Sequence, residues 1–87
     1  MDMNALIKRI KDRPDSDRVG MILCHNGVVR GTSRDGRKVT GVTVRADHAV
    51  LERIIAEQKQ RPGIIEILVE VNEGDLSVGD DLLLIAV

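Results

Sequence analysis

The stretch that decides the fold is residues 64–87, IIEILVEVNEGDLSVGDDLLLIAV. Residues 64–71 alternate, so one face would be wholly aliphatic while the other carries two glutamates. This period of two is typical of a strand with one half-exposed face. Residues 72–81 contain two glycines and predict a loop. Residues 82–87, LLLIAV, are apolar at every position and predict a central strand that is covered on both faces.

Two further strands are expected upstream. Residues 19–30 are rich in apolar side chains and lack a helix cap, which predicts a strand. Gly27 interrupts this strand and indicates a bulge or a close backbone approach. Asp35 and Gly36 form a turn signal. The alternating, β-branched residues 38–46 are therefore interpreted as the partner strand of a hairpin.

Two helices complete the pattern. Leu6, Ile7 and Ile10 recur at helical spacing, and Pro14 ends that segment. Asp47 is typical of a helix N-cap. One apolar stripe follows it, made of Val50, Leu51, Ile54 and Ile55. The order of helices and strands predicts an α+β fold, a largely antiparallel sheet with two helices packed on it, in a single domain of residues 1–87.

Composition excludes several classes of function. The 87 residues contain no Phe, Tyr or Trp, so the core must be aliphatic and no aromatic platform can stack on bases. The net charge of −1 gives no general attraction to nucleic acid or to an anionic membrane. No apolar run approaches the roughly 20 residues of a membrane span. One cysteine rules out an internal disulfide and fits a cytoplasmic protein.

The sequence offers no clear catalytic or metal site. Cys24 and His25 are neighbours on a predicted strand, so their side chains should point to opposite faces. Cys24 is interpreted as a buried, inert residue. Glu66 and Glu70 would share a face but lie about 13 Å apart, too far for a paired-carboxylate site. One cysteine and two histidines match no zinc pattern, and no cofactor motif is present.

A basic cluster lies around the predicted hairpin turn. It consists of Arg30, Arg34, Arg37 and Lys38. Arginine forks bind phosphate or carboxylate, so the cluster is a candidate anion site. The alternative is a solvated hairpin tip, which fits Arg34 and Arg37 best. Arg30 is expected inside the strand, where it would need a partner, either a carboxylate of the fold or a bound anion.

Two motifs resemble the large subunit of molybdopterin synthase. The stretch GVVRGTSRDGRKVTGVTVRAD is similar to the family's Gly-x-Val-Arg strand with its hairpin, second strand and helix, and here the motif spans residues 27–30. The stretch EGDLSVGDDLLLIAV is similar to a Gly-x-Leu-x-x-Gly-acidic segment followed by an apolar strand. The matching positions there are Gly74, Leu76, Gly79 and Asp80. The resemblance covers residues 19–87.

The resemblance implies a role in sulfur transfer during molybdenum cofactor biosynthesis. In that family the large subunit forms a homodimer and binds a ubiquitin-like small subunit, whose C-terminal thiocarboxylate supplies sulfur to a cyclic pyranopterin phosphate. It implies that Arg30 holds the pterin phosphate or the small subunit's carboxyl terminus.

This sequence departs from the family at two places. His25 stands where the family has an aromatic residue. The family's catalytic histidine, arginine and lysines follow the last strand, and the sequence stops at Val87 before them. No catalytic residue is therefore assigned, and enzymatic activity is expected only if a segment follows Val87. The chain is interpreted as a piece of a longer protein. The alternative is a non-enzymatic oligomerisation or regulatory module that kept the fold.

Overall fold

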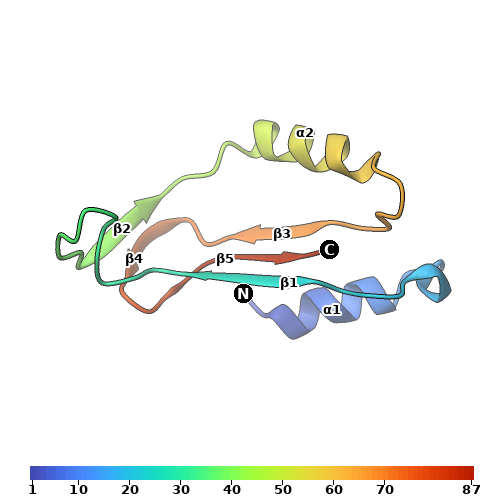
Figure 1. The fold of residues 1–87 in the computed structure, drawn as a ribbon, viewed down its shortest axis with the longest axis horizontal. Helices are drawn as coiled ribbons and strands as arrows, with labels where there is room; N and C mark the ends of the chain where they lie inside the picture. Colours follow the sequence, from blue (N-terminus) through green and yellow to red (C-terminus); the bar gives the residue numbers. More distant parts are fainter.

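A computed structural model describes all residues 1–87 (Figure 1). The elements in chain order are α1 (Met3–Lys11), a 3-10 turn (Ser16–Arg18), β1 (Cys24–Val28), β2 (Gly41–Val44), α2 (His48–Lys59), β3 (Leu68–Val71), β4 (Gly74–Ser77) and β5 (Asp81–Ala86). The strands form two antiparallel sheets, β1-β5-β3 and β2-β4. The α+β class with two helices and antiparallel pairing is thus confirmed. None of the helices combines the length and the hydrophobicity needed to span a bilayer.

The three-stranded sheet is built around β5. This strand pairs with β1 from Cys24–Ala86 to Val28–Asp81, and with β3 from Leu68–Ala86 to Val71–Leu83. The prediction that LLLIAV is the central strand is confirmed. The register shifts between Gly27 and Val28, because Leu82 is one extra residue on β5. A bulge at Gly27 is therefore confirmed, and its extra residue lies in the partner strand.

Helix α1 closes one face of this sheet. Asp2 caps the helix by accepting a hydrogen bond from the Asn4 amide at 2.9 Å. The helix then buries Leu6 and Ile10 against Leu84 and Ala86 of β5. These four side chains form the hydrophobic core of the molecule, and the helical spacing of Leu6 and Ile10 creates its helix side.

The pairing of β2 differs from the prediction. Residues 38–46 were expected to pair with the strand before the turn, but β2 pairs with β4 and only a single Thr32–Lys38 bridge remains of the hairpin. β1 is already paired along its length with the long apolar β5. Gly41 permits the β2–β4 approach, since a Cβ there would lie 2.6 Å from the Leu76 carbonyl oxygen.

Three predicted element boundaries were also wrong. The strand expected at 19–30 is regular only over β1, and the strand expected at 64–71 only over β3. The loop expected at 72–81 contains β4, which pairs with β2. Short strands such as β4 carry little periodic signal, and their pairing partner decides whether they form.

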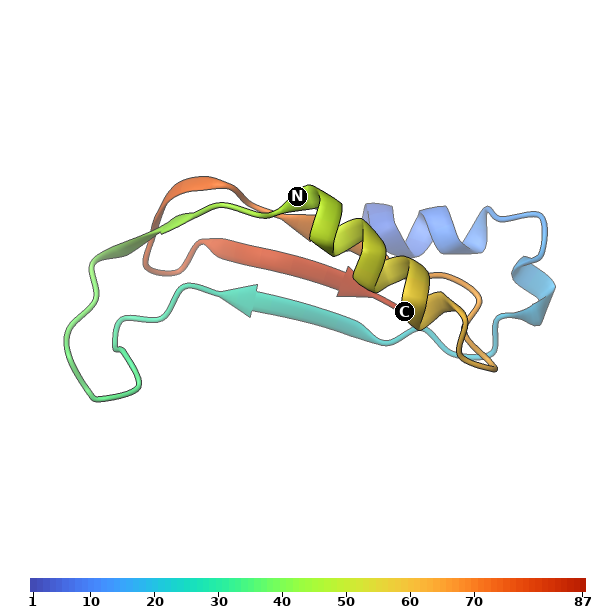
Figure 2. The same cartoon turned by 90° about the horizontal axis from the view of Figure 1, so that it is seen from above.

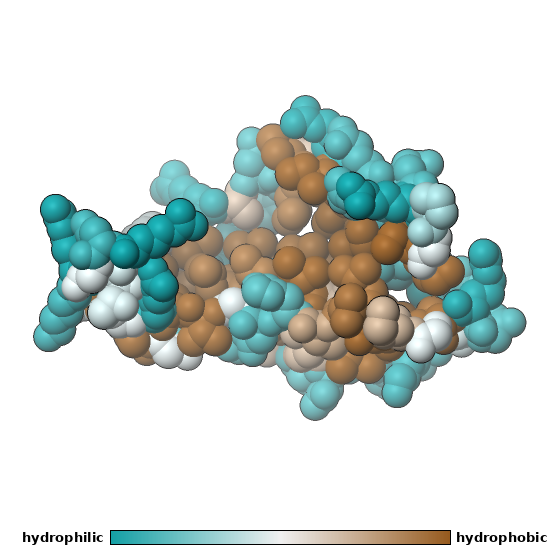
Figure 3. Space-filling model, in the orientation of Figure 1, coloured by the Kyte–Doolittle hydropathy of each residue, from teal (hydrophilic) through white to brown (hydrophobic).

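Helix α2 lies across the opposite face of the sheet and leaves a groove beneath it. Asp47 caps the helix through a 3.1 Å hydrogen bond from the Val50 amide, as predicted. None of its residues is buried. The groove has a volume of about 510 Å³ and an almost wholly aliphatic lining, and Figure 3 shows hydrophobic residues exposed below α2. The aliphatic lining residues are Leu51, Ile54, Ile55, Ile64, Ile67, Val69, Val71, Leu83, Ile85 and Val87.

Candidate functional site

The basic cluster lies on a loop, residues 29–39, at one end of the molecule. The start of the loop is held by Val29, which is buried. The Val29 amide donates to the Asp80 carbonyl at 2.9 Å, and the Gly79 amide donates to the Val29 carbonyl at 2.8 Å. Both partners lie in the turn before β5. The Val39 amide closes the loop by donating to the Gly31 carbonyl at 2.9 Å. The loop therefore starts at the buried Val29 and ends close to where it started.

The tip of this loop is an ordered turn. The Ser33 amide donates to the Arg37 carbonyl at 2.9 Å, and Gly36 supplies the positive φ of 84° that the turn requires. Asp35 accepts hydrogen bonds from the Ser33 hydroxyl and the Arg37 amide, which hold the pKa of its carboxyl below the usual value. The Arg37 guanidinium pairs with Asp35 at 3.1 Å. The Asp35–Gly36 turn signal is thus confirmed.

Three of the four cations on the loop have no partner in the protein. Arg30, Arg34 and Lys38 are exposed and form no salt bridge, whereas Arg37 is partly neutralised by Asp35. Arg30 was expected inside a strand, but it lies two residues beyond the end of β1, where its side chain is exposed to solvent. Because Arg30 is not buried, it does not require a charged partner.

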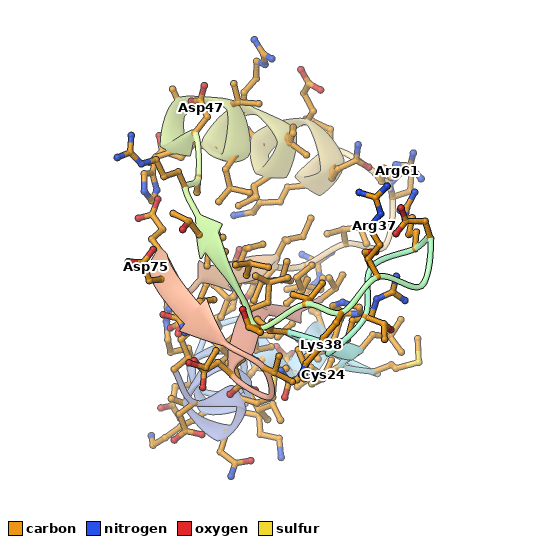
Figure 4. The ribbon with its side chains drawn as sticks, turned by 90° about the vertical axis from the view of Figure 1, so that its left-hand side faces the viewer. Cys24, Arg37, Lys38, Asp47, Arg61 and Asp75 are labelled. Carbon is orange, nitrogen blue, oxygen red and sulfur yellow. The ribbon has the colours of Figure 1, made fainter.

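The loop presents these cations without a competing carboxylate apart from Asp35. Figure 4 views this end of the molecule, with Arg37 and Lys38 on one side and Asp75 of β4 on the other. The Asp75 carboxylate instead accepts a hydrogen bond from the Thr43 hydroxyl at 2.7 Å. A phosphate or carboxylate bound at the loop would meet guanidinium forks that are free to form charge-assisted hydrogen bonds.

Neither the single cysteine nor either histidine lies on this loop. Cys24 begins β1, four residues and therefore about 13 Å along the strand from Val28. Cys24 is exposed, not buried as predicted, because α1 packs on β5 and leaves this edge strand uncovered. No three of the His, Cys, Asp and Glu side chains gather closely enough to hold a metal ion. The arrangement can bind an anion through its exposed arginines.

An ion-pair cluster at the other end of the molecule was missed from the sequence. Glu66, only 15% exposed, accepts hydrogen bonds from Arg13 at 2.6 Å and from Lys59 at 2.8 Å. Arg13 also donates two hydrogen bonds to the Asp15 carboxylate, from Nε at 2.8 Å and from Nη2 at 3.2 Å. The cluster joins the turn after α1, the end of α2 and the segment before β3. The only sequence signal is a glutamate inside the apolar run IIEIL.

Opposing effects set the pKa of Glu66. Its partial burial would raise the pKa, but the hydrogen bond from Lys59, the Ile67 amide and the charge of Arg13 together lower it below the usual value. The carboxylate is thus held in its ionised form. The role of this cluster is structural, because each of its charged groups has a partner within the protein.

The groove under α2 is the second candidate site. Its polar lining residues are Gln58 and Arg61, and Arg61 forms no salt bridge. The groove lies below α2, whereas the basic loop projects beyond the far end of β1 (Figure 1). The two candidate sites are therefore separate, one apolar and one cationic.

Comparison with known proteins places the chain in a family. The MoaE protein family matches it over residues 1–87. An uncharacterized protein of Methanocaldococcus jannaschii is 38% identical over 72 residues, which are 78% of this chain and 60% of that protein. The chain thus spans about 60% of the length of this curated relative. No solved structure matches it. Because the family match runs through both helices and both sheets, the chain belongs to the MoaE protein family, the family of the molybdopterin synthase large subunit.

Proposed function

We propose that this protein acts in molybdenum cofactor biosynthesis as the large-subunit component of molybdopterin synthase. Family membership supports the pathway. In the proposed reaction, sulfur passes from the thiocarboxylate of a ubiquitin-like small subunit to a cyclic pyranopterin phosphate. We further propose that the protein is cytoplasmic and that residues 1–87 form a single domain. The contribution of these residues is to bind and orient the substrates.

The observation that carries this proposal is the set of unpaired cations on an anchored loop. Arg30 directly follows the buried Val29, so it is the cation that lies next to the anchor of the loop. We assign the phosphate of the pterin, or the carboxyl terminus of the small subunit, to Arg30. Arg34 lies nearer the tip and would add charge, and Arg37 would contribute less because Asp35 already holds it.

The test is to titrate the wild type and Arg30→Ala with a pterin monophosphate and to measure the affinity of each by calorimetry. Loss of a charge-assisted hydrogen bond is worth about 1.5–3 kcal/mol, so the affinity should fall by roughly tenfold to a hundredfold. Arg53→Ala is the matched control, because Arg53 is an exposed arginine on α2, away from the loop. Equal affinity of wild type and Arg30→Ala would remove Arg30 from the site.

A second candidate function is a non-enzymatic oligomerisation or regulatory module. One observation favours it: aliphatic surface remains exposed under α2. The two functions are separated by incubating the protein with a thiocarboxylated small subunit and the pyranopterin. Binding of the thiocarboxylated small subunit supports the synthase component, and a protein that binds neither the small subunit nor the pyranopterin supports the module.

A further inference from the structure

The segment from β4 to the start of β5 holds both ends of the basic loop. The loop begins at Val29, whose two backbone groups bond to Gly79 and Asp80 in the turn after β4. The loop then leads into β2, which pairs with β4 itself. Figures 1 and 2 show the turn between β4 and β5 at the same end of the molecule as the basic loop. One short segment therefore fixes where the loop starts and where it ends.

The turn between β4 and β5 is closed by the Asp80 side chain as well as by its backbone. The Asp80 carboxylate accepts a hydrogen bond from the Ser77 amide at 2.8 Å. The Asp80 amide donates to the Ser77 carbonyl at 3.0 Å, and Gly79 supplies the positive φ of 93° within the turn. The same two residues are thus joined twice, so the carboxylate reinforces the turn.

The turn is linked to Arg30 through Val29. The groups that bond to Val29 are the Gly79 amide, at 2.8 Å, and the Asp80 carbonyl, at 2.9 Å. Val29 is also held by packing, since only 4% of it is exposed. Arg30 is the next residue, and it forms no salt bridge with Asp80. An effect of the Asp80 carboxylate on Arg30 therefore runs through the backbone.

We propose that Asp80 is a positioning residue for the anion site: its carboxylate orders the turn, the turn holds Val29, and Val29 sets where Arg30 leaves the sheet. This inference rests on the proposed function, in which Arg30 receives a phosphate. It also gives a role to the Gly79–Asp80 part of the segment EGDLSVGDD.

The proposal reverses the sign that simple electrostatics predicts. A carboxylate near a cationic loop repels an anion, so its removal should tighten phosphate binding. A positioning carboxylate does the opposite, because its removal releases the turn that orients Arg30. The direction of the change in affinity therefore separates the two roles of Asp80.

The test is to titrate the wild type, Asp80→Ala and Asp80→Asn with a pterin monophosphate. Asp80→Ala leaves the Ser77 amide without its side-chain acceptor, so the affinity should fall about threefold to tenfold. Asp80→Asn keeps an oxygen acceptor and should bind at least as tightly as the wild type. Asp75→Ala is the matched control, because it removes a carboxylate of β4 that bonds to the Thr43 hydroxyl and not to the turn. This control should not weaken binding.

A double-mutant cycle tests whether Asp80 acts through Arg30. In an Arg30→Ala background, Asp80→Ala should cause no further loss of affinity, because the group that it positions is already gone. A general structural role would lower the affinity by the same factor in both backgrounds. Equal losses in the two backgrounds, or an affinity of Asp80→Ala equal to or above that of the wild type, overturn the proposal.

Hydrogen exchange tests the same link without a ligand. The Val29 amide should exchange faster in Asp80→Ala than in Asp80→Asn or the wild type, while the Leu84 amide in β5 should be unchanged. Circular dichroism checks that each variant remains folded. If the wild type does not bind the pterin monophosphate, the proposed function fails, and the exchange still decides the role of Asp80: faster exchange at Val29 supports it, and unchanged exchange overturns it.

Discussion

The two faces of the central sheet are covered in different ways. On one face, α1 buries Leu6 and Ile10 against β5. On the other face, α2 runs above the aliphatic side chains of β3 and β5 but buries none of its own residues. Polar contacts hold α2 at its two ends: Glu73 bonds to the Ala46 amide at 2.7 Å and to His48 at 3.1 Å, and Lys59 pairs with Glu66. Packing therefore holds one helix, and end contacts hold the other.

This difference shows that an amphipathic sequence pattern does not by itself determine how deeply a helix is buried. Both helices carry an apolar stripe, yet only the α1 stripe contains fully buried residues, whereas Leu51 and Ile55 of α2 are half-buried. The free energy gained from burial depends on the apolar area removed from water, so α1 should dominate stability. The predictions below compare the two faces, from the largest expected effect to the smallest.

Leu6→Ala should cause the largest loss of stability. Leu6 is fully buried, and truncating a buried leucine removes apolar contacts and leaves a cavity, at a cost of about 3 kcal/mol in the free energy of unfolding. The matched variant is Ile54→Ala on α2, whose side chain is 47% exposed, and its effect should stay within about 0.5 kcal/mol. Urea denaturation measures both. Equal losses would show that α2 packs on the sheet in solution and that the groove is closed.

Glu66→Gln should have an intermediate effect. The substitution removes the partner charge of Arg13 and Lys59 in a partly buried cluster, which should cost about 1–2 kcal/mol. Lys8→Gln is the control, because the Lys8–Asp12 pair is exposed on α1 and should contribute little.

The effect of Glu66→Gln should depend on pH. The folded state lowers the pKa of Glu66, so its contribution to stability is present above the ordinary value of 4.5 and is lost as the pH falls through the folded pKa. The difference between wild type and Glu66→Gln should therefore be constant near neutral pH and shrink below about pH 4.5. A difference that grows as the pH falls would contradict an ionised, paired Glu66.

Glu73→Gln should give the smallest effect. The hydrogen bond from the Ala46 amide, then the one with His48, lower the pKa of Glu73, and both contacts lie at the solvent-exposed start of α2. We expect little change in global unfolding but faster amide hydrogen exchange in the first turn of α2. The Leu84 amide in β5 is the internal control and should exchange as in the wild type. Unchanged exchange in α2 would mean that Glu73 does not hold this end of the helix.

Much of this fold could be predicted from local pattern, and the rest depended on pairing between distant segments. The six apolar letters of LLLIAV predict a central strand, and Asp47 and Asp35–Gly36 are local signals that the structure confirms. The pairing of β2 with β4 could not be predicted, because it depends on a close approach at Gly41 and on β1 already being paired with β5. The exposure of Cys24 likewise depends on which strand α1 covers.

The candidate site shows the same division. The basic residues could be listed from the sequence, and their chemistry indicated an anion site. The sequence could not predict which of these residues lack a partner in the protein. The structure shows that Arg37 pairs with Asp35 and that Arg30 lies beyond the end of β1. The Arg13–Glu66–Lys59 cluster joins residues far apart in sequence, so only the tertiary structure brings it together.

The central claim is that the basic loop, and not the groove under α2, receives the phosphate. The most direct measurement is amide chemical-shift mapping by NMR while a pterin monophosphate is added to the isotope-labelled protein. The account predicts shifts confined to the loop from Arg30 to Lys38 and its anchor at Gly79, with none at groove residues such as Ile54 and Val69. Shifts at the groove with an unperturbed loop, or no shifts at all, would contradict it.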